Sequence, residues 1–225
     1  HDGIFFVLQY LTFLELLRMA EVCKSLRDAV RDDIVPGNKL VVYGNWKPQF
    51  SDDWLAGLAA KLGGRVQTLV LVQCFGITDD GLLRFVLSNP KITELHVRCC
   101  RVTPEGLITV ARHLRLKILR MEGTLFVNKD HLETLHQLVQ SPYHQRIFSH
   151  RFGVYQLNQL GRAIDVEVCP KCNLVEVVYD CPRVSCEDKC RACLCCTSRC
   201  LGCGACLRAG RQLLDGFYMA CESCI

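Results

Sequence analysis

The sequence predicts an α/β protein: a short solenoid of strand-and-helix repeats, with an apolar helical segment before it and a small cysteine-rich module after it. Three observations support this fold class. Residues 66–139 repeat one strand-and-helix pattern, residues 4–20 are almost entirely apolar, and 13 of the 17 cysteines lie between Cys169 and Cys224. We therefore expect three domains, at residues 1–35, 36–163 and 164–225.

The central repeat joins a short apolar strand to a polar helix start. Leu69-x-Leu71-x-x-Cys74 recurs as Leu95-x-Val97-x-x-Cys100 and, more loosely, as Leu119-x-Met121-x-x-Thr124, at steps of 26 and 24 residues. Polar helix starts follow at Thr78, Thr103 and Asn128. This period and pattern are typical of leucine-rich repeats, in which neighbouring repeats cover one another's apolar faces. Parallel strands are therefore expected.

An irregular repeat precedes these three. Pro36-Gly37-Asn38 interrupts the helical pattern, and Leu40–Tyr43 is predicted to form a strand. Ser51-Asp52-Asp53 then caps a helix that ends at Gly63-Gly64. The apolar face of this helix consists of Trp54, Leu55, Leu58 and Leu62.

Side chains along the repeats are assigned structural roles. The strand positions Leu69, Leu71, Leu95, Val97, Leu119 and Met121 are expected to point inward. Cys23, Cys74, Cys99 and Cys100 are expected at positions that favour small buried residues, with Cys74 and Cys100 as structural thiols at the turns. The scattered His96, His113, His131 and His136 are expected on the surface. No nucleophile, phosphate-binding glycine loop or paired-carboxylate motif occurs. No catalytic residue is predicted, so the protein is not expected to be an enzyme.

The composition limits the partners and the compartment. A net charge of +4 is too small to indicate nucleic acid or an anionic membrane, and no apolar run reaches the ~18 residues that span a bilayer. The thiols occur as close C-x-x-C pairs, which favours shared metal ions over an extracellular disulfide framework. We expect an intracellular protein, in the nucleus and/or the cytoplasm.

The C-terminal thiols predict zinc. Twelve of them follow a regular spacing, namely Cys169, Cys172, Cys181, Cys186, Cys190, Cys193, Cys196, Cys200, Cys203, Cys206, Cys221 and Cys224. Because no histidine follows His150, the sites would be all-cysteine, holding two or three ions in tetrahedral geometry, with Cys195 left over. Cross-brace and sequential groupings both fit this spacing.

Two other assignments compete with zinc. The run Cys190-x-x-Cys193-x-x-Cys196-x-x-x-Cys200 matches a ferredoxin-type iron–sulfur motif, although no proline follows Cys200. A RING finger has similar pair spacing but normally contains a histidine. Residues 169–225 contain 7 Lys/Arg and 6 Asp/Glu, and each loaded four-thiolate site adds about two negative charges. Nucleic acid is therefore not an expected partner.

The N-terminal segment is apolar around most of its circumference. Between Ile4 and Ala20 the polar residues are Gln9, Thr12, Glu15 and Arg18, which form one thin helical stripe. Thr12–Glu15 fits a capping box between two short helices. Such a segment needs cover, either from the solenoid or from another protein.

These residues also resemble the F-box, the motif that docks substrate receptors onto the Skp adaptor of cullin–RING (SCF) ubiquitin ligases. The resemblance lies in Asp2-x-Ile4, Leu8-x-x-Leu11, Glu15-Leu16-Leu17 and Val22-Cys23-Lys24-Ser25-Leu26. The usual Leu-Pro at the start of the motif is absent, so we expect an upstream segment to be missing. Leu26 stands where tryptophan is common.

The whole chain resembles plant Skp-interacting F-box proteins, which combine an F-box, repeats and a cysteine-rich tail. The resemblance implies a substrate-recognition subunit that binds a Skp adaptor, through it a cullin, and an unidentified target protein. It implies adaptor contacts at Ile4, Leu8, Leu11, Leu14, Leu17, Val22, Cys23 and Leu26. The alternative function is a zinc or iron–sulfur module in redox or nucleic-acid work, with the front helices as a structural cap.

Overall fold

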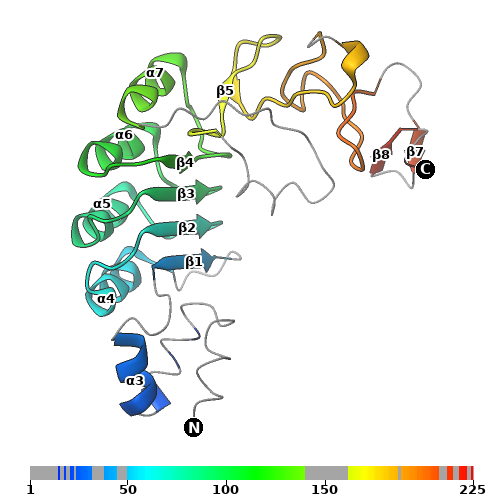
Figure 1. The fold of residues 1–225 in the computed structure, drawn as a ribbon. Helices are drawn as coiled ribbons and strands as arrows, with labels where there is room; N and C mark the ends of the chain where they lie inside the picture. The colour runs from blue at the N-terminus through cyan, green and yellow to red at the C-terminus, as the bar shows by residue number, and fades with distance from the viewer. Residues whose placement is uncertain are drawn as a thin grey trace. The chain divides into compact units, whose positions relative to one another are not determined.

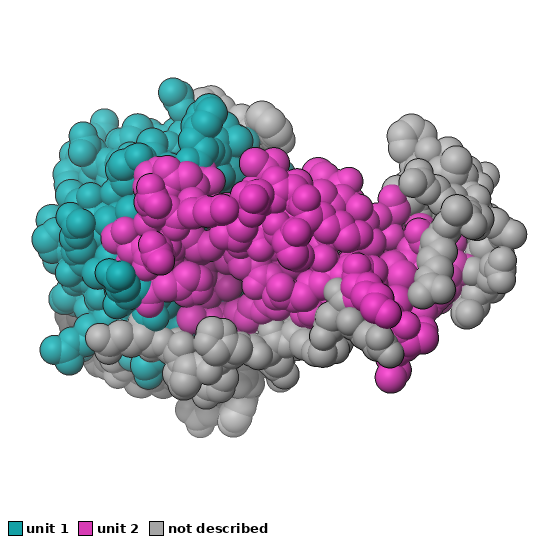
Figure 2. Space-filling model, turned by 90° about the horizontal axis from the view of Figure 1, so that it is seen from above, with its two compact units in different colours: residues 1–126, 137–140 teal, residues 127–136, 141–225 magenta. Residues whose placement is uncertain are grey.

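The computed structural model describes residues 15, 18, 21, 22, 24–31, 38–44, 50–139, 162–186, 189–207, 212–214, 218–221 and 224. The chain divides into two compact units (Figure 2). Unit 1 comprises residues 1–126 and 137–140, and unit 2 comprises residues 127–136 and 141–225.

Unit 1 contains a four-stranded parallel sheet in the order β1-β2-β3-β4. Strands and helices alternate along the chain as β1 (Lys39–Tyr43), α4 (Asp52–Leu62), β2 (Thr68–Val72), α5 (Asp79–Ser88), β3 (Glu94–Arg98), α6 (Pro104–His113) and β4 (Ile118–Arg120). Figure 1 shows the strands in one layer and α4, α5 and α6 stacked along it in a second layer. The predicted α/β repeat fold with parallel strands is confirmed.

The strands are held in register by rows of apolar side chains. One row consists of Leu40, Leu69, Leu95 and Leu119, and a second of Val42, Leu71 and Val97. All of these side chains are fully buried, and Met121 is nearly so. Burial of a large aliphatic side chain stabilises a fold by roughly 1.5–3 kcal/mol, so these rows form the main core of the unit.

The predicted helix boundaries are confirmed. Ser51, Thr78 and Thr103 lie at the N-caps of α4, α5 and α6, and each side-chain oxygen accepts a hydrogen bond from a backbone N–H in the first turn. The capping residue Gly63 at the end of α4 has a φ of 57°, in the left-handed region that favours glycine.

A ladder of aspartate–threonine contacts links successive helices. One carboxylate oxygen of Asp52 accepts from Thr78 N at 2.8 Å and the other from Thr78 Oγ1 at 2.6 Å. Asp79 makes the same two bonds to Thr103, at 2.8 and 2.6 Å. Each aspartate in the first turn of one helix therefore satisfies the N-cap residue of the next.

The ladder depends on small residues facing the aspartates. A Cβ added at Gly81 would lie 1.9 Å from Asp52 Oδ1, and one at Gly106 would lie 2.1 Å from Asp79 Oδ1. These glycines are needed for close approach rather than for an unusual backbone conformation.

The ladder ends at α6, where Pro104 occupies the position of Asp52 and Asp79. Helix α7 (Lys129–Leu138) begins with a different cap. His131 N donates to Asn128 Oδ1 at 2.8 Å, and Asn128 N donates to His131 Nδ1 at 3.3 Å. This capping role of His131 was not predicted.

His96 corrects one expectation. It was expected on the surface, but it lies on β3 with 4% of its side chain exposed, in a row with Val41, Val70 and Arg120. Side chains alternate along a strand, so this row is on the sheet face opposite Leu95 and Val97. Burial lowers the pKa of His96 to about 4, helped by the positive charges of nearby arginine and lysine side chains.

Among the thiols of the repeats, Cys74 is buried as expected, whereas Cys100 is half-buried and Cys99 is exposed. Cys74 Sγ lies 3.7 Å from Val42 O and 3.5 Å from its own repeat's Val72 O. In the next repeat, Cys100 Sγ lies 3.5 Å from the carbonyl oxygen of Leu71, which belongs to the preceding repeat. Both thiols therefore join adjacent turns of the solenoid.

Unit 2 contains two short antiparallel hairpins, β5 (Glu167–Val168) with β6 (Val175–Glu176) and β7 (Gln212–Leu214) with β8 (Tyr218–Ala220). A 3-10 turn, η2, covers Val184–Cys186. From the sequence, the predicted strand at 164–168 could belong either to a further repeat or to the start of the cysteine module. Its pairing with β6 makes it the start of the module.

The N-terminal segment is described in part. Residues 15, 18, 21 and 22 are helical, and α3 covers Lys24–Arg31. Of the predicted adaptor contacts, Val22 is 72% exposed. Leu26 lies in α3 but its side chain is outside the described part, as are Ile4, Leu8, Leu11, Leu14, Leu17 and Cys23. Among the described helices, none is long and apolar enough to cross a membrane.

Candidate metal centre

Unit 2 brings the twelve regularly spaced cysteines into three groups of four. Cluster 1 consists of Cys169, Cys172, Cys193 and Cys196; cluster 2 of Cys181, Cys186, Cys190 and Cys206; and cluster 3 of Cys200, Cys203, Cys221 and Cys224. Within each cluster the sulfur atoms all lie within 4.8 Å of one another. Cys195, which the sequence left over, belongs to no cluster of the described residues and is exposed.

Two of the clusters begin with the same backbone turn. Cys169 N donates to Leu174 O at 2.8 Å, and Cys169 O accepts from Asn173 N at 2.9 Å. Cys200 makes the equivalent bonds with Ala205 O and Gly204 N, both at 2.8 Å. The fifth residue of each turn, Asn173 or Gly204, has a positive φ, which asparagine and glycine tolerate best. This local geometry presents two thiols of a C-x-x-C pair to one point.

The sulfur spacing fits a single tetrahedral ion. Zinc–sulfur bonds of ~2.3 Å place the sulfurs of a tetrahedron about 3.8 Å apart. The distances are 3.9 Å for Cys172–Cys193, 3.4 Å for Cys186–Cys206 and 3.6 Å for Cys203–Cys221. A disulfide would need ~2.05 Å. An all-thiolate site of this size suits zinc.

Backbone amides prepare one cysteine of each cluster for ionisation. Burial alone raises the pKa of Cys169, but the N–H groups of residues 193, 172 and 171 outweigh it and lower the pKa to about 6. Cys193 N, for example, lies 3.4 Å from Cys169 Sγ. Cys181 and Cys200 have the same balance and the same pKa of about 6.

Each cluster also contains thiols whose pKa is raised, among them Cys196, Cys190 and Cys224. The pKa of Cys196 is raised to about 12, first by its hydrogen bond with Cys172 and then by desolvation. Desolvation and hydrogen bonds to neighbouring thiols raise the pKa of Cys190 to about 12 as well. Four crowded thiols cannot all ionise alone, and a dication among them removes this conflict.

The ferredoxin-type run is not kept together. Its cysteines are divided among clusters 2, 1, 1 and 3 in chain order, so the run does not surround one site. An iron–sulfur cluster of several ions would also hold its cysteines further apart than one ion does. The clusters interleave along the chain in a cross-brace manner, one of the two groupings that the sequence left open. Clusters 1 and 3 each combine two C-x-x-C pairs, whereas cluster 2 takes one cysteine from each of the pairs Cys190–Cys193 and Cys203–Cys206 and so divides them.

An ion-pair network supports the clusters. Arg162 and Arg191 both bind the buried Asp180, at 3.2 and 3.0 Å, and both also bind Glu167. Asp180 directly precedes the cluster 2 residue Cys181. Buried Arg199 donates hydrogen bonds to four backbone carbonyls. The roles of Asp180 and Arg199 were not predicted from the sequence, because no local pattern distinguishes them from surface charges.

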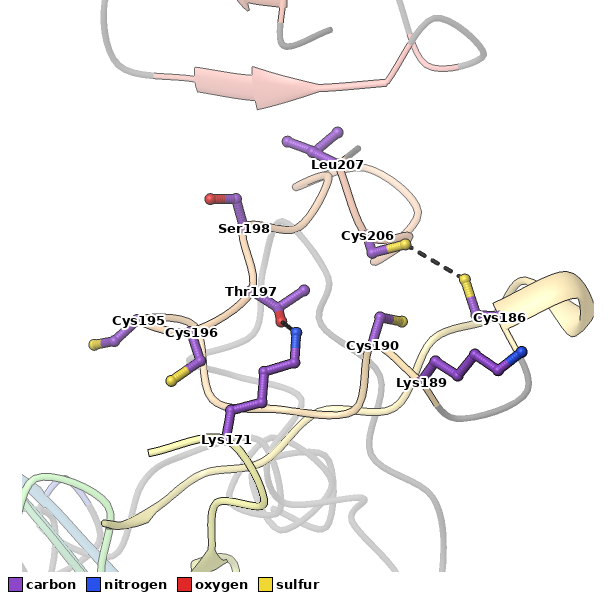
Figure 3. Close-up of a pocket in the computed structure, with 10 residues that line it drawn as sticks. All are labelled: Lys171, Cys186, Lys189, Cys190, Cys195, Cys196, Thr197, Ser198, Cys206 and Leu207. Carbon is purple, nitrogen blue, oxygen red and sulfur yellow. Dashed lines mark hydrogen bonds between the residues drawn. The ribbon is translucent and has the colours of Figure 1, made fainter. Parts of the chain in front are cut away.

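A cavity of about 400 Å³ lies between clusters 1 and 2 (Figure 3). Its lining includes Lys171 and Lys189, and Lys171 Nζ donates to Thr197 Oγ1 at 2.8 Å. In Figure 3 the Cys195 side chain points away from Cys186, Cys190 and Cys206. Both lysines line the same cavity as thiols of clusters 1 and 2, where positive charge would favour loaded, anionic clusters.

The fold and the site define a class of protein: an α/β repeat protein, similar in architecture to leucine-rich repeats, with a module of three four-cysteine clusters. Comparisons with known proteins identify the two ends of the chain. Residues 2–36 match the F-box domain, and residues 165–225 match the At3g27290 F-box protein C-terminal domain. The chain belongs to the family of F-box proteins.

Three Arabidopsis thaliana relatives are similar over most of this chain. F-box protein SKIP28 is 36% identical over 92% of the chain, F-box protein SKIP14 is 34% identical over 92%, and F-box protein At3g27290 is 30% identical over all of it. The chain spans 68%, 50% and 65% of the lengths of these relatives, respectively.

Proposed function

We propose that this chain is a non-catalytic substrate receptor of an SCF-type ubiquitin ligase, acting in the nucleus and/or cytoplasm. The observation that carries the proposal is the match of residues 2–36 to the F-box domain in a chain that also contains repeats and a second F-box-protein domain. The F-box would bind a Skp adaptor and through it a cullin. The repeats and the cysteine module would hold a target protein.

The apolar character of the N-terminal segment supports its proposed role as the adaptor-binding surface. The front segment is apolar, and its described side chain Val22 is largely exposed, as expected for half of an interface. The proposed contacts are Ile4, Leu8, Leu11, Leu14, Leu17, Val22, Cys23 and Leu26. Burying several such side chains, at roughly 1.5–3 kcal/mol each, is ample for a stable subunit contact.

The docking test is a charge placed in the apolar front segment. Leu17→Asp should abolish co-purification with a Skp adaptor, because an unpaired carboxylate would be buried in the interface. Leu87→Asp is the matched control, since Leu87 lies on α5 and is 55% exposed. It should leave adaptor binding unchanged. Adaptor binding that survives Leu17→Asp would contradict the assignment.

We further propose that each of the three clusters holds one zinc ion, with the twelve cysteines named above as ligands. The sulfur spacing and the single amide-stabilised thiolate of each cluster support this assignment. Zinc would supply the folding energy that a small module rich in cysteine cannot obtain from an apolar core. The redox and nucleic-acid alternative gains no support from the divided ferredoxin-type run.

A further inference from the structure

Arg199 occupies a central position among the clusters. It lies between Cys196, the last cysteine of cluster 1, and Cys200, the first of cluster 3. Only 3% of its side chain is exposed. Its Nη2 donates to Tyr179 O at 2.6 Å and to Cys190 O at 2.7 Å, and its Nη1 donates to Asp180 O at 3.2 Å and to Gly204 O at 3.4 Å.

These four carbonyls belong to segments that carry all three clusters. Tyr179 forms a β-bridge with Ala192, which packs in the core of cluster 1. Cys190 is a cluster 2 cysteine, and Asp180 precedes another. Gly204 follows Cys203 of cluster 3. One guanidinium therefore fixes the positions of backbone segments from each site.

The charge of Arg199 needs a counter-charge. A buried cation is costly unless anions compensate it, and the four acceptors of this guanidinium are neutral carbonyls. The nearby carboxylates of Asp180 and Glu167 are bound by two other arginines. A four-thiolate site with a dication would carry about two negative charges, and the segments that Arg199 binds bear cysteines of all three clusters, so loaded clusters would favour the buried cation.

The order of cysteines along the chain also joins the sites. Cys181, Cys186 and Cys190 lie between the two halves of cluster 1, and Cys200 and Cys203 lie between the two parts of cluster 2. The segment that carries the cysteines of one cluster is therefore a loop closed by the cysteines of another cluster. If one cluster holds no metal ion, that loop is not ordered, and the cluster that closes it is destabilised. Both the chain connectivity and the hydrogen bonds of the Arg199 guanidinium therefore link the folding of one cluster to the folding of the others.

From these contacts we propose that Arg199 couples the three clusters, so that the module takes up its metal ions as one cooperative unit. This inference rests on the proposal that the clusters hold metal. Arg199 is a positioning residue: it touches no ligand sulfur and acts through the backbone and through its charge. A receptor built in this way presents its cysteine module either complete or unfolded.

The test counts ions on individual molecules. The full chain is stripped of metal under reducing conditions, given zinc chloride below saturation, and examined by native mass spectrometry. The unaltered chain should populate the zero-ion and three-ion states. Arg199→Met should populate one-ion and two-ion states. The chelator concentration that removes half of its zinc should be at least about tenfold lower than for the unaltered chain.

Two further variants make the outcome decisive. Arg183→Met is the matched control, because Arg183 also places its charge near cysteines of clusters 2 and 3 but its side chain is exposed rather than buried among backbone carbonyls; it should keep the two-state pattern. Arg199→Lys keeps the charge but not the planar fork, and it should also populate intermediate states. It decides the question if Arg199→Met does not fold.

Three results would overturn the coupling. They are one-ion and two-ion states in the unaltered chain at statistical abundance, a two-state pattern in Arg199→Lys, and equal effects of the Arg183 and Arg199 variants. A chain that binds no zinc at all fails the metal proposal instead, so the two failures are distinguishable.

Discussion

His96 is a titratable group enclosed in the repeat sheet, so its protonation opposes folding. Its pKa is about 4 in the folded chain, against ~6.5 for an unperturbed histidine. The unfolded state therefore takes up the proton first as the pH falls. The stability contribution is complete above pH ~6.5 and is lost as the pH falls toward 4, by about 3 kcal/mol in total.

Unfolding by urea, followed by tryptophan fluorescence, measures this contribution. Both tryptophans, Trp46 and Trp54, belong to unit 1. His96→Gln should flatten the fall in stability between pH 6.5 and 4, whereas His113→Gln, at the end of α6, should not. Identical pH slopes for His96→Gln and the unaltered chain would refute this account of the buried imidazole.

Residue environments were the least predictable feature from sequence. The strand Leu95–Val97 was predicted from its apolar positions, but the intervening His96 was placed on the surface because polar side chains normally face solvent there. Its burial depends on what covers the other face of the sheet, which no local pattern encodes. Arg199 was missed for the same reason, since its carbonyl partners lie 5 to 20 residues away.

At the scale of elements, the aspartate–threonine ladder determines how successive repeats are joined. Asp79→Ala removes two hydrogen bonds to Thr103 and leaves a helix N-cap without its partner. We expect unit 1 to lose about 1–3 kcal/mol of unfolding free energy. Asp80→Ala is the control: it removes an exposed carboxylate from the same helical turn and should cost less than about 1 kcal/mol.

The facing glycine gives an independent check of the ladder. Gly106→Ala should destabilise unit 1 at least as much as Asp79→Ala, because the new Cβ collides with the Asp79 carboxylate. Urea unfolding followed by tryptophan fluorescence serves for both variants. Equal stability of the Asp79 and Asp80 variants would show that the ladder contributes nothing measurable.

Elements were predictable where the determining pattern is local. The apolar alternation of the strands, the N-caps at Ser51, Thr78 and Thr103, and the turn at Gly63 are all short-range signals, and the structure confirms them. The grouping of the cysteines is not local. The turns that begin at Cys169 and Cys200 are alike, so spacing alone could not assign either turn to its partner pair.

At the scale of the whole molecule, the two units are stabilised by different means. Rows of leucine and valine fill the core of unit 1, whereas the buried clusters of unit 2 consist mainly of cysteines with Val178, Ala192 and Ala205. Removing metal should therefore unfold the module and leave the repeats folded.

Chelation under reducing conditions tests this difference. Three colourless zinc ions per chain are expected before treatment; afterwards the module cysteines should react with an alkylating agent while tryptophan fluorescence stays unchanged. Cys195→Ser should keep all three ions, and Cys196→Ser should lose at least one. Visible absorbance from bound iron, or fewer than three ions in the untreated chain, would contradict the zinc assignment.

Pro104 has a consequence for how this array could grow. An acceptor carboxylate, Asp52 or Asp79, follows the N-cap of α4 and of α5, but Pro104 follows that of α6. Counting from β1, the third repeat (β3 and α6) therefore accepts the aspartate contact of the second repeat but has no aspartate to contact the next. Duplicating the second repeat would lengthen the chain of links, because the new copy brings its own aspartate. Duplicating the third would insert a break. A longer ladder in this solenoid is therefore obtained by copying an earlier repeat rather than the one that begins α6.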